Sequence, residues 1–249
     1  MVILEAKNVT KHFDSLLVVD HVNLKITKGN IHSIIGPNGA GKTTLFNLLT
    51  GFVSLTSGEI IYKGEAITNL PPYKIAKKGI SRSFQITSIF PELSVHENIR
   101  IAAQSREKSS FNFIKHFGKL ENSKKKADQI LNFIGLYEKR NTLAANLAYG
   151  EKRILDIGIA ISTDPEILLL DEPMAGLPEG DLDKVMQLIK KISENLTITL
   201  IDHNIDQIIA ISNVITVLNQ GSVIAEGSPR EIQDNQKVQE AYLGGLSTC

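Results

Sequence analysis

A glycine-rich loop, GPNGAGKTT from Gly36 to Thr44, lies between an apolar run at residues 31–35 and a helix-forming segment at 42–50. The loop fits the pattern G-x-x-x-x-G-K-[ST], in which glycines let successive backbone N–H groups curl around phosphate oxygens at a helix N-terminus. The motif needs a strand before it and a helix after it, and the apolar pattern predicts both. The chain must therefore contain a strand–loop–helix unit that binds phosphate.

This loop supplies the groups that a nucleoside triphosphate requires. Lys42 is placed to reach the β and γ phosphates, and the Thr43 hydroxyl is placed to ligate Mg²⁺. We therefore expect a nucleoside triphosphate and Mg²⁺ as the bound species. The residues predicted to contact the nucleotide are Gly36, Pro37, Asn38, Gly39, Ala40, Gly41, Lys42, Thr43 and Thr44.

A second motif is the apolar run 167–170 followed by Asp171 and Glu172. Parallel sheets bind ligands at the carboxyl ends of their strands, so Asp171 is predicted to hold Mg²⁺ directly or through water. Glu172 is then placed to orient and deprotonate an attacking water. Together with the loop, this motif predicts a nucleoside triphosphate hydrolase. The sequence has no Asn-Lys-x-Asp stretch, which argues against a GTPase.

The remaining pattern predicts an α/β fold. Strands at 3–10, 16–26 and 58–62 suggest a small antiparallel layer, and the middle of the chain reads as helical, with Ser94 and Glu97 at capping-box spacing. Strands alternating with helices after it imply a parallel core sheet covered on both faces. The elements expected there are a helix from 151, a strand at 167–170, a helix at 179–193, a strand at 197–201, a helix at 205–211, a hairpin at 214–225 and a last helix from 228.

Composition limits the partners. Lys plus Arg and Asp plus Glu each number 27, so no net field draws the protein to nucleic acid, and no nucleic-acid partner is expected. The basic run 124–126 is short enough to be a solvated helix face. No apolar run approaches the roughly 18 residues of a membrane-spanning helix, and the N-terminus has no secretory signal pattern. We therefore expect a cytoplasmic protein that meets a membrane only through a partner.

The segment LAYGE at 147–151 resembles the signature motif of ATP-binding-cassette (ABC) ATPases, and the resemblance extends over essentially the whole chain. It implies that the bound nucleotide is ATP. It also implies further roles: Phe13 stacks on adenine, Gln85 senses Mg²⁺ and water, 174–178 is the D-loop, and His203 contacts the γ-phosphate. For Phe13 the alternative is an ordinary core aromatic residue.

The same resemblance implies a single nucleotide-binding domain over 1–249. A RecA-like P-loop NTPase core with an antiparallel β subdomain would occupy 1–86 and 151–249, and a helical signature subdomain would occupy 87–150. It also implies a head-to-tail dimer with a second ATPase subunit, the same chain or a related one. In that dimer the partner's nucleotide is held by Ala148, Tyr149, Gly150 and Glu151.

The signature and D-loop depart from the commonest ABC pattern. Ala148 lacks the usual hydroxyl, Glu151 adds a negative charge that Lys152 and Arg153 are expected to offset, and Pro178 replaces a polar D-loop residue. These departures and the ending EAYLG resemble the ATPases of branched-chain amino-acid importers. The alternatives are a urea-uptake or lipopolysaccharide-export ATPase, or an ABC ATPase of nucleic-acid maintenance, which would need a long coiled-coil insertion.

A transporter ATPase of this family works with transmembrane permease subunits, so the chain is expected at the inner face of the cell membrane. The predicted contact is an apolar surface beside Gln85 that receives a short helix of the permease. Internal packing of the helical segment is the equally weighted alternative for the same residues. They are Ile86, Ile89, Phe90 and Leu93.

Overall fold

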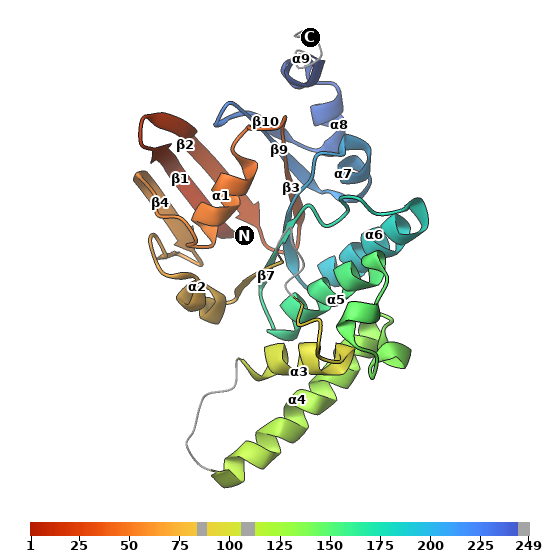
Figure 1. Cartoon of the computed structure of the whole chain (residues 1–249). Helices are drawn as coiled ribbons and strands as arrows, with labels where there is room; N and C mark the ends of the chain where they lie inside the picture. Colours follow the sequence, from red (N-terminus) through yellow and green to blue (C-terminus); the bar gives the residue numbers. More distant parts are fainter. Residues whose placement is uncertain (84–88, 106–112, 244–249) are drawn as a thin grey trace.

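The computed structural model describes residues 1–83, 89–105 and 113–243, and it confirms the α/β fold (Figure 1). Its core is a six-stranded sheet in the order β10-β9-β3-β8-β7-β6. The strands run parallel except for β10, which pairs antiparallel with β9. The strands are β3 (Ile31–Ile35), β6 (Ile80–Arg82), β7 (Ile167–Asp171), β8 (Thr197–Ile201), β9 (Val214–Asn219) and β10 (Ser222–Gly227).

The central strands β3, β7 and β8 are buried along their whole length, because helices and a second sheet cover the two faces. Successive residues of β7 alternate between two hydrophobic cores. Leu168 and Leu170 belong to the core under the helices, whereas Ile167 and Leu169 belong to the core shared with the second sheet. This explains why β7 reads in the sequence as an unbroken apolar run.

The second sheet is antiparallel, in the order β2-β1-β4-β5. Helix α1 (Lys42–Leu49) packs between this sheet and the core sheet, with Phe46 and Leu49 fully buried (Figure 1). Gly51 follows the helix with a φ of 74°, as expected for a left-handed C-terminal stop. The strands are β1 (Val2–Phe13), β2 (Leu16–Thr27), β4 (Ser57–Tyr62) and β5 (Glu65–Ala66).

The other face of the core sheet is covered by helices α5 (Tyr149–Ser162), α6 (Glu179–Ser193) and α7 (Ile205–Ile211). Helices α3 (Val95–Gln104) and α4 (Phe113–Phe133) pack beyond α5, at the end of the molecule opposite α8 (Pro229–Gln233) and α9 (Gln236–Leu243) (Figure 1). Short 3₁₀ helices, η1 (Tyr137–Lys139) and η2 (Ala144–Asn146), join α4 to α5. The division of the chain into subdomains remains a prediction.

The elements missing from the sequence interpretation include helix α2 (Pro72–Lys78), strand β6, the two-residue strand β5 and the separate helix α9. The Pro71-Pro72 pair concealed a helix that has proline at its first position, where proline is tolerated. Strand β6 is too short to show a periodic pattern, yet it forms the edge of the core sheet and carries Arg82. Within the described ranges no helix is long and apolar enough to cross a membrane.

Candidate functional site

The phosphate loop leaves β3 at Gly36 and enters α1 at Lys42. A Cβ at Gly36 would lie 2.1 Å from the Leu218 carbonyl oxygen of β9, a separation that no side chain tolerates. Gly41, the N-cap of α1, has a φ of 96°, and a Cβ there would lie 2.6 Å from the Val18 carbonyl oxygen of β2. Both glycines are therefore required by close approach of the loop to neighbouring strands.

A tight turn between β9 and β10 holds the loop in place. The Gly221 N–H donates to the Ala40 carbonyl at 3.1 Å, and the Gly221 carbonyl accepts from the Asp20 N–H of β2 at 2.9 Å. The turn therefore connects the loop, the core sheet and the antiparallel sheet. This support leaves the loop backbone in one defined conformation.

Lys42 is buried inside the loop. Its Nζ donates to the Gly36 carbonyl at 2.7 Å and to the Pro37 carbonyl at 3.1 Å. Burial lowers the pKa of Lys42, and the carboxylates of Glu172, Asp202 and Asp171, in that order, act against this shift. An ammonium group has three donors, so one N–H remains for an anion. These features fit a phosphate group.

A cavity of about 230 Å³ lies over the loop, lined by residues 38–44, Val18 and Glu172. The fold thus brings Glu172, from the far end of β7, to the same cavity as Lys42. Thr43 is exposed at this surface, so its hydroxyl is accessible. Gly36 and Pro37 contribute carbonyls to Lys42 and are not among the lining residues.

Glu172 follows β7 with a φ of 47°, which is unusual for a residue other than glycine. Three hydrogen bonds hold its backbone: its N–H donates to Ile201 O at 2.9 Å, and its carbonyl accepts from Ala175 N at 3.2 Å and from Arg153 Nη2 at 2.6 Å. Strained backbone that is held by its surroundings is common at functional sites. The geometry supports a defined role for this carboxylate.

Asp171 has a different environment from its neighbour. Its carboxylate is buried, and Oδ2 accepts from Arg82 Nη2 at 2.7 Å. Arg82 also donates to Asn47 Oδ1 at 2.7 Å and to Thr50 Oγ1 at 3.2 Å. Asp171 is not among the residues that line the loop cavity. The sequence interpretation missed Arg82, because an isolated arginine at a strand end carries no recognisable motif.

His203 lies beside Glu172, as the order of the motifs suggested. Its Nδ1 is 3.9 Å from Glu172 Oε1 and 3.7 Å from Asp202 Oδ1, and the side chain is 57% exposed. Asp202 stabilises the turn, since its buried Oδ1 accepts from the backbone N–H groups of His203 at 2.8 Å and Asn204 at 3.2 Å. The imidazole is thus accessible on a well-supported loop.

Phe13, at the end of β1, is 44% exposed, so the alternative that it packs in the core is wrong. The Lys11 ammonium lies 4.8 Å from the centre of its ring. Gln85 lies outside the described residues. Its proposed role is therefore untested by this geometry.

The signature segment forms the start of α5. This helix begins at Tyr149, two residues before Glu151, where the sequence predicted its start. Ala148 is the N-cap and has no hydroxyl to cap the helix, but its N–H donates to Glu151 Oε2 at 3.1 Å. Glu151 pairs with Lys139 at 2.5 Å, and this hydrogen bond is the main cause of its lowered pKa. The expectation for Arg153 was wrong, because its buried guanidinium donates to the Glu172 carbonyl.

The segment also contacts the D-loop and α6 of the same chain. The Tyr149 hydroxyl donates to the Ala175 carbonyl at 3.3 Å, and a Cβ at Gly150 would lie 2.5 Å from Asp181 Oδ2. None of the four residues 148–151 lines the cavity of the phosphate loop. The chain therefore presents two separate regions, each carrying part of the expected nucleotide contacts.

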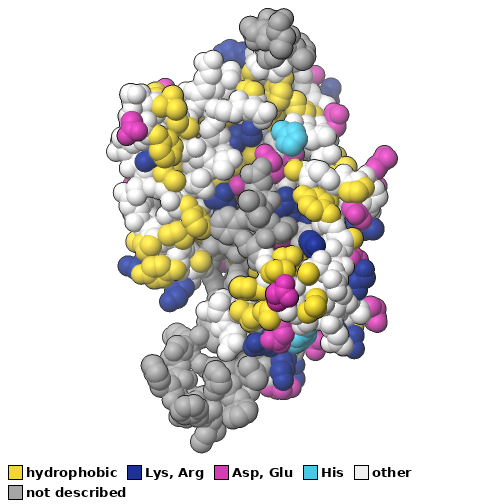
Figure 2. All heavy atoms as spheres, in the orientation of Figure 1, with side chains coloured by type: hydrophobic (Ala, Val, Ile, Leu, Met, Phe, Trp, Pro, Cys, Tyr) yellow, Lys and Arg dark blue, Asp and Glu magenta, His cyan; other side chains and the backbone are white. Residues whose placement is uncertain are grey.

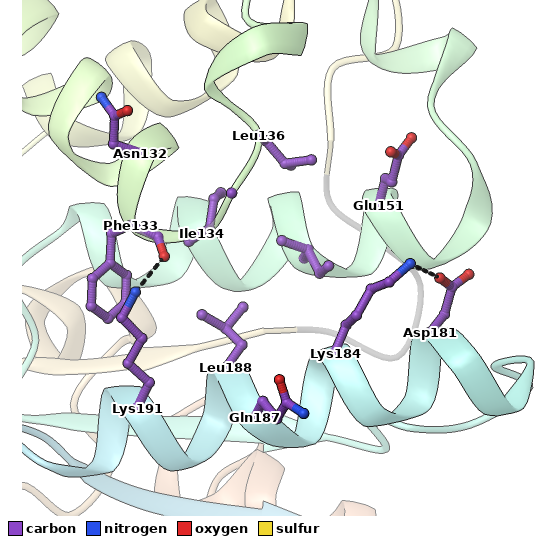
Figure 3. A pocket seen from close by; sticks show the side chains of 12 residues that line it. Asn132, Phe133, Ile134, Leu136, Glu151, Asp181, Lys184, Gln187, Leu188 and Lys191 are labelled. Atoms are coloured by element: carbon purple, nitrogen blue, oxygen red, sulfur yellow. Dashed lines mark hydrogen bonds and ion pairs between the residues drawn. The ribbon is translucent and has the colours of Figure 1, made fainter.

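A larger cavity, of about 520 Å³, lies between the end of α4 and helices α5 and α6 (Figure 3). Leu136, from the segment after α4, and Leu188, from α6, line it from opposite sides (Figure 3). Both lysines drawn at its edge are engaged: Lys191 donates to the Phe133 carbonyl at 3.0 Å, and Lys184 pairs with Asp181 at 2.9 Å. The first contact joins α6 to the end of α4, whereas the second lies within α6.

The arrangement fits Mg²⁺ that arrives with a nucleotide. The parts of the chain that the structure describes contain no group of three or more His, Cys, Asp or Glu suited to a metal. Mg²⁺ is commonly held by one or two carboxylates together with substrate phosphates. The oxygen donors near the loop include the Thr43 hydroxyl and the carboxylates of Asp171 and Glu172. This donor set is compatible with that mode of binding.

Comparison with known proteins gives the family. The family model described as ABC transporter matches residues 19–175, and the one described as branched-chain amino acid ATP-binding cassette transporter matches 222–245. The high-affinity branched-chain amino acid transport ATP-binding protein BraF of Pseudomonas aeruginosa is 41% identical over 97% of this chain and 98% of its own length. The corresponding protein LivG of Escherichia coli K12 is 40% identical over the same shares.

Solved structures agree. The ADP conformation of MJ1267, an ATP-binding cassette of an ABC transporter, has a TM-score of 0.87 at 29% identity, covering 98% of this chain and 99% of that one. A dimeric post-hydrolysis state of the cassette MJ0796, bound to ADP and Pi, has a TM-score of 0.77 at 26% identity, covering 91% and 99%. With this likeness along its whole length, the chain belongs to the ABC transporter family of ATP-binding, ATP-hydrolysing cassettes.

Proposed function

We propose that this protein is the ATP-hydrolysing subunit of an importer of branched-chain amino acids. The observation that carries the catalytic part is the shared cavity, in which Glu172 faces a phosphate loop that contains the buried cation of Lys42. The transported substrate is proposed from the named relatives, whose likeness covers 97% of the chain.

The residues divide the chemistry between them. The loop N–H groups and Lys42 bind and hold the phosphates, while Thr43 and Asp171 hold Mg²⁺, which neutralises phosphate charge when bound. Glu172 orients water and accepts its proton, and His203 donates a hydrogen bond to the terminal phosphate. Gln85 assists at the metal and water. Phe13 offers an exposed ring to the adenine.

A second ATPase subunit completes the site. The segment Ala148–Tyr149–Gly150–Glu151 lies at the N-terminus of the 14-residue helix α5, where backbone N–H groups and the helix dipole favour an anion. Because this segment does not line the chain's own loop cavity, we assign it to the nucleotide of a partner in a head-to-tail dimer. Dimeric structures of similar cassettes support this assignment.

The permease subunits are proposed to dock beside Arg82. A cavity of about 280 Å³ there is lined by Phe52 and Tyr73, both more than half exposed. Figure 2 shows hydrophobic side chains gathered over α2 on this face. Of the residues named for this contact, Phe90 is 55% exposed and Ile89 packs partly against the main core, while Ile86 is outside the described residues. With this docking, we propose that the protein works at the cytoplasmic face of the membrane.

The catalytic proposal is tested with Glu172→Gln, which removes the proton acceptor and preserves shape. We expect loss of steady-state ATP hydrolysis with ATP binding retained, and an ATP-dependent dimer on size-exclusion chromatography in Mg²⁺. Glu194→Gln, at an exposed glutamate beyond α6, is the matched control. Hydrolysis by Glu172→Gln at the wild-type rate would exclude Glu172 as the base.

The substrate is tested separately by uptake of labelled leucine, isoleucine and valine into cells that express the native transporter. Replacing the chain with Glu172→Gln should abolish uptake of all three, and urea uptake should not change. Unchanged amino-acid uptake together with lost urea uptake would instead assign the chain to a urea system.

A further inference from the structure

Arg82 occupies an unusual position for an arginine. It ends the edge strand β6, yet its side chain is only 6% exposed, and its guanidinium reaches Asp171 at the end of the neighbouring strand β7. Its centre lies 5.7 Å from the ring of Phe46 and 5.8 Å from that of Phe52. The two rings and the surrounding protein restrict the guanidinium to one location.

The guanidinium bonds on two sides. Nη2 donates to Asp171 Oδ2 at 2.7 Å, while Nη1 donates to Asn47 Oδ1 at 2.7 Å and to Thr50 Oγ1 at 3.2 Å. Asn47 and Thr50 come from α1 and its C-terminal cap, the helix that begins at the phosphate loop. Because a planar guanidinium presents its donors in a fixed fork, these bonds set the direction of the Asp171 carboxylate relative to α1.

Burial of such a pair is not by itself a route to stability. Desolvation of two charges offsets much of their attraction, so an apolar pair of similar volume is often as stable. The arrangement is better explained by orientation: Arg82 engages Oδ2 and leaves Oδ1 outside this ion pair. Asp171 is the residue assigned to Mg²⁺, for which the direction of a carboxylate oxygen matters.

We propose that Arg82 is a positioning residue that holds Asp171 in the orientation needed for Mg²⁺. This inference rests on the proposed function. Residues that orient a metal ligand without touching the metal commonly change metal affinity by about 10- to 100-fold when replaced. Of the two neighbouring carboxylates, Asp171 and Glu172, Arg82 thus acts on Asp171, the one assigned to Mg²⁺.

A separate observation links the second of these residues, Glu172, to Arg153. This residue of α5 is 2% exposed, and its Nη2 donates to the Glu172 carbonyl at 2.6 Å. Glu172 adopts a φ of 47°, a conformation that needs external support. We infer that Arg153 positions the Glu172 backbone and hence the direction of its carboxylate toward the cavity. The two arginines approach adjacent residues from different elements, so their effects should be separable.

The experiment uses the full chain and two readouts. A fluorescent ATP analogue is titrated in EDTA and at increasing Mg²⁺, and kcat and KM for ATP are measured at saturating Mg²⁺. For Arg82→Met we expect unchanged binding in EDTA, and the Mg²⁺ concentration for half-maximal tightening should rise by about tenfold or more. For Arg153→Met we expect an unchanged Mg²⁺ titration with kcat lowered by about tenfold or more and KM unaffected.

Further variants protect the test against loss of folding. Asn47→Ala removes a partner of Arg82 without touching Asp171, and should shift the Mg²⁺ titration in the same direction by less. Arg82→Lys and Arg153→Lys keep the charge and should each restore part of the wild-type value. Circular dichroism melts identify variants that have not folded.

Each proposal can fail by itself. An Mg²⁺ titration of folded Arg82→Met or Asn47→Ala that coincides with wild type would overturn the role of Arg82. A wild-type kcat in folded Arg153→Met would overturn that of Arg153. A wild-type chain that binds the analogue equally with and without Mg²⁺ would instead contradict the proposed function, and the Arg82 inference with it.

Discussion

At the scale of single residues, glycines of equal chemistry have very different roles. Gly36 approaches a neighbouring carbonyl so closely that a Cβ would lie 2.1 Å from it, whereas a Cβ at Gly29 would meet nothing within 4 Å. Only the first of these is part of the phosphate loop. Position in the fold, and not glycine content, decides which substitution is tolerated.

We therefore expect Gly36→Ala to displace the loop and abolish binding of a fluorescent ATP analogue. Gly29→Ala is the control: its φ of 81° is the left-handed conformation, which costs about 1–2 kcal/mol for a side chain, and nucleotide binding should persist. Urea unfolding and nucleotide titration of both variants provide the measurement. Normal affinity in Gly36→Ala would contradict the close packing of the loop on β9.

His32 predicts a pH effect on stability. It is buried in β3, its Nε2 lies 2.7 Å from Thr216 Oγ1, and burial lowers its pKa from 6.5 to about 4. Between these values the unfolded chain binds a proton that the folded chain does not, so the free energy of unfolding falls as the pH drops. From pH 7 to pH 5 this amounts to about 2 kcal/mol.

The measurement is urea unfolding of wild type and His32→Gln at pH 7 and pH 5. The variant has no titrating group at this position, so its loss of stability on acidification should be smaller by about 2 kcal/mol, whatever its absolute stability. Thr216 Oγ1 also donates to Glu226 Oε2 at 2.8 Å, so this hydroxyl links the imidazole of His32 to a carboxylate. Equal pH dependence in the two proteins would show that folding does not lower the pKa of His32.

At the scale of elements, the start of α3 illustrates a partly realised motif. Ser94 caps the helix, with its side-chain oxygen accepting from the Glu97 N–H at 3.1 Å, as the spacing predicted. The Glu97 carboxylate, however, binds Arg100 at 2.7 Å, and this hydrogen bond is the main cause of its lowered pKa. The reciprocal bond of a full capping box is replaced by an ion pair within the helix.

This arrangement makes Ser94→Ala a test of the cap alone. Loss of the oxygen leaves an N–H of the first turn without its partner, and we expect destabilisation by about 1 kcal/mol in thermal or urea unfolding. Ser105→Ala, at the other end of α3, is the matched control, because Ser105 is the C-cap and its hydroxyl merely donates to the Ala102 carbonyl in the last turn of the helix. Equal destabilisation by the two substitutions would contradict a specific contribution of the N-cap hydrogen bond to stability.

At the scale of the whole molecule, the helical segment and the core sheet share one hydrophobic core. Ile99 of α3 and Leu131 of α4 belong to the same buried cluster as Leu168 and Leu170 of β7. A subdomain with its own core would unfold separately. The shared core instead predicts that damage within the helices is felt throughout the protein.

We expect Leu131→Ala, at a fully buried position, to lower the free energy of unfolding by about 2–5 kcal/mol while the protein still unfolds in one transition. Leu143→Ala, 43% exposed in the same part of the chain, should cost much less. Circular dichroism and intrinsic fluorescence of tyrosine follow the transition. A separate early transition in Leu131→Ala would show that the helical segment is an independent folding unit.

The sequence by itself determined the α/β fold, the phosphate loop and most of the later helices and strands. Glycine spacing, apolar periodicity and carboxylates at a strand end are local features, and they constrain local structure directly. Helix α6 was expected at 179–193 and lies at Glu179–Ser193 for this reason. The resemblance in short motifs also pointed correctly to the family.

Only the tertiary structure decided how the groups meet. Three contacts at the site join residues that are far apart in the chain. They are the Arg82–Asp171 ion pair, the Arg153 hydrogen bond to the Glu172 carbonyl and the Gly221 hydrogen bond to Ala40 of the phosphate loop. Sequence spacing cannot predict such pairs, because each depends on strand order and on which side of a strand a residue faces. The sequence therefore determines the parts of the site, and packing determines their orientation.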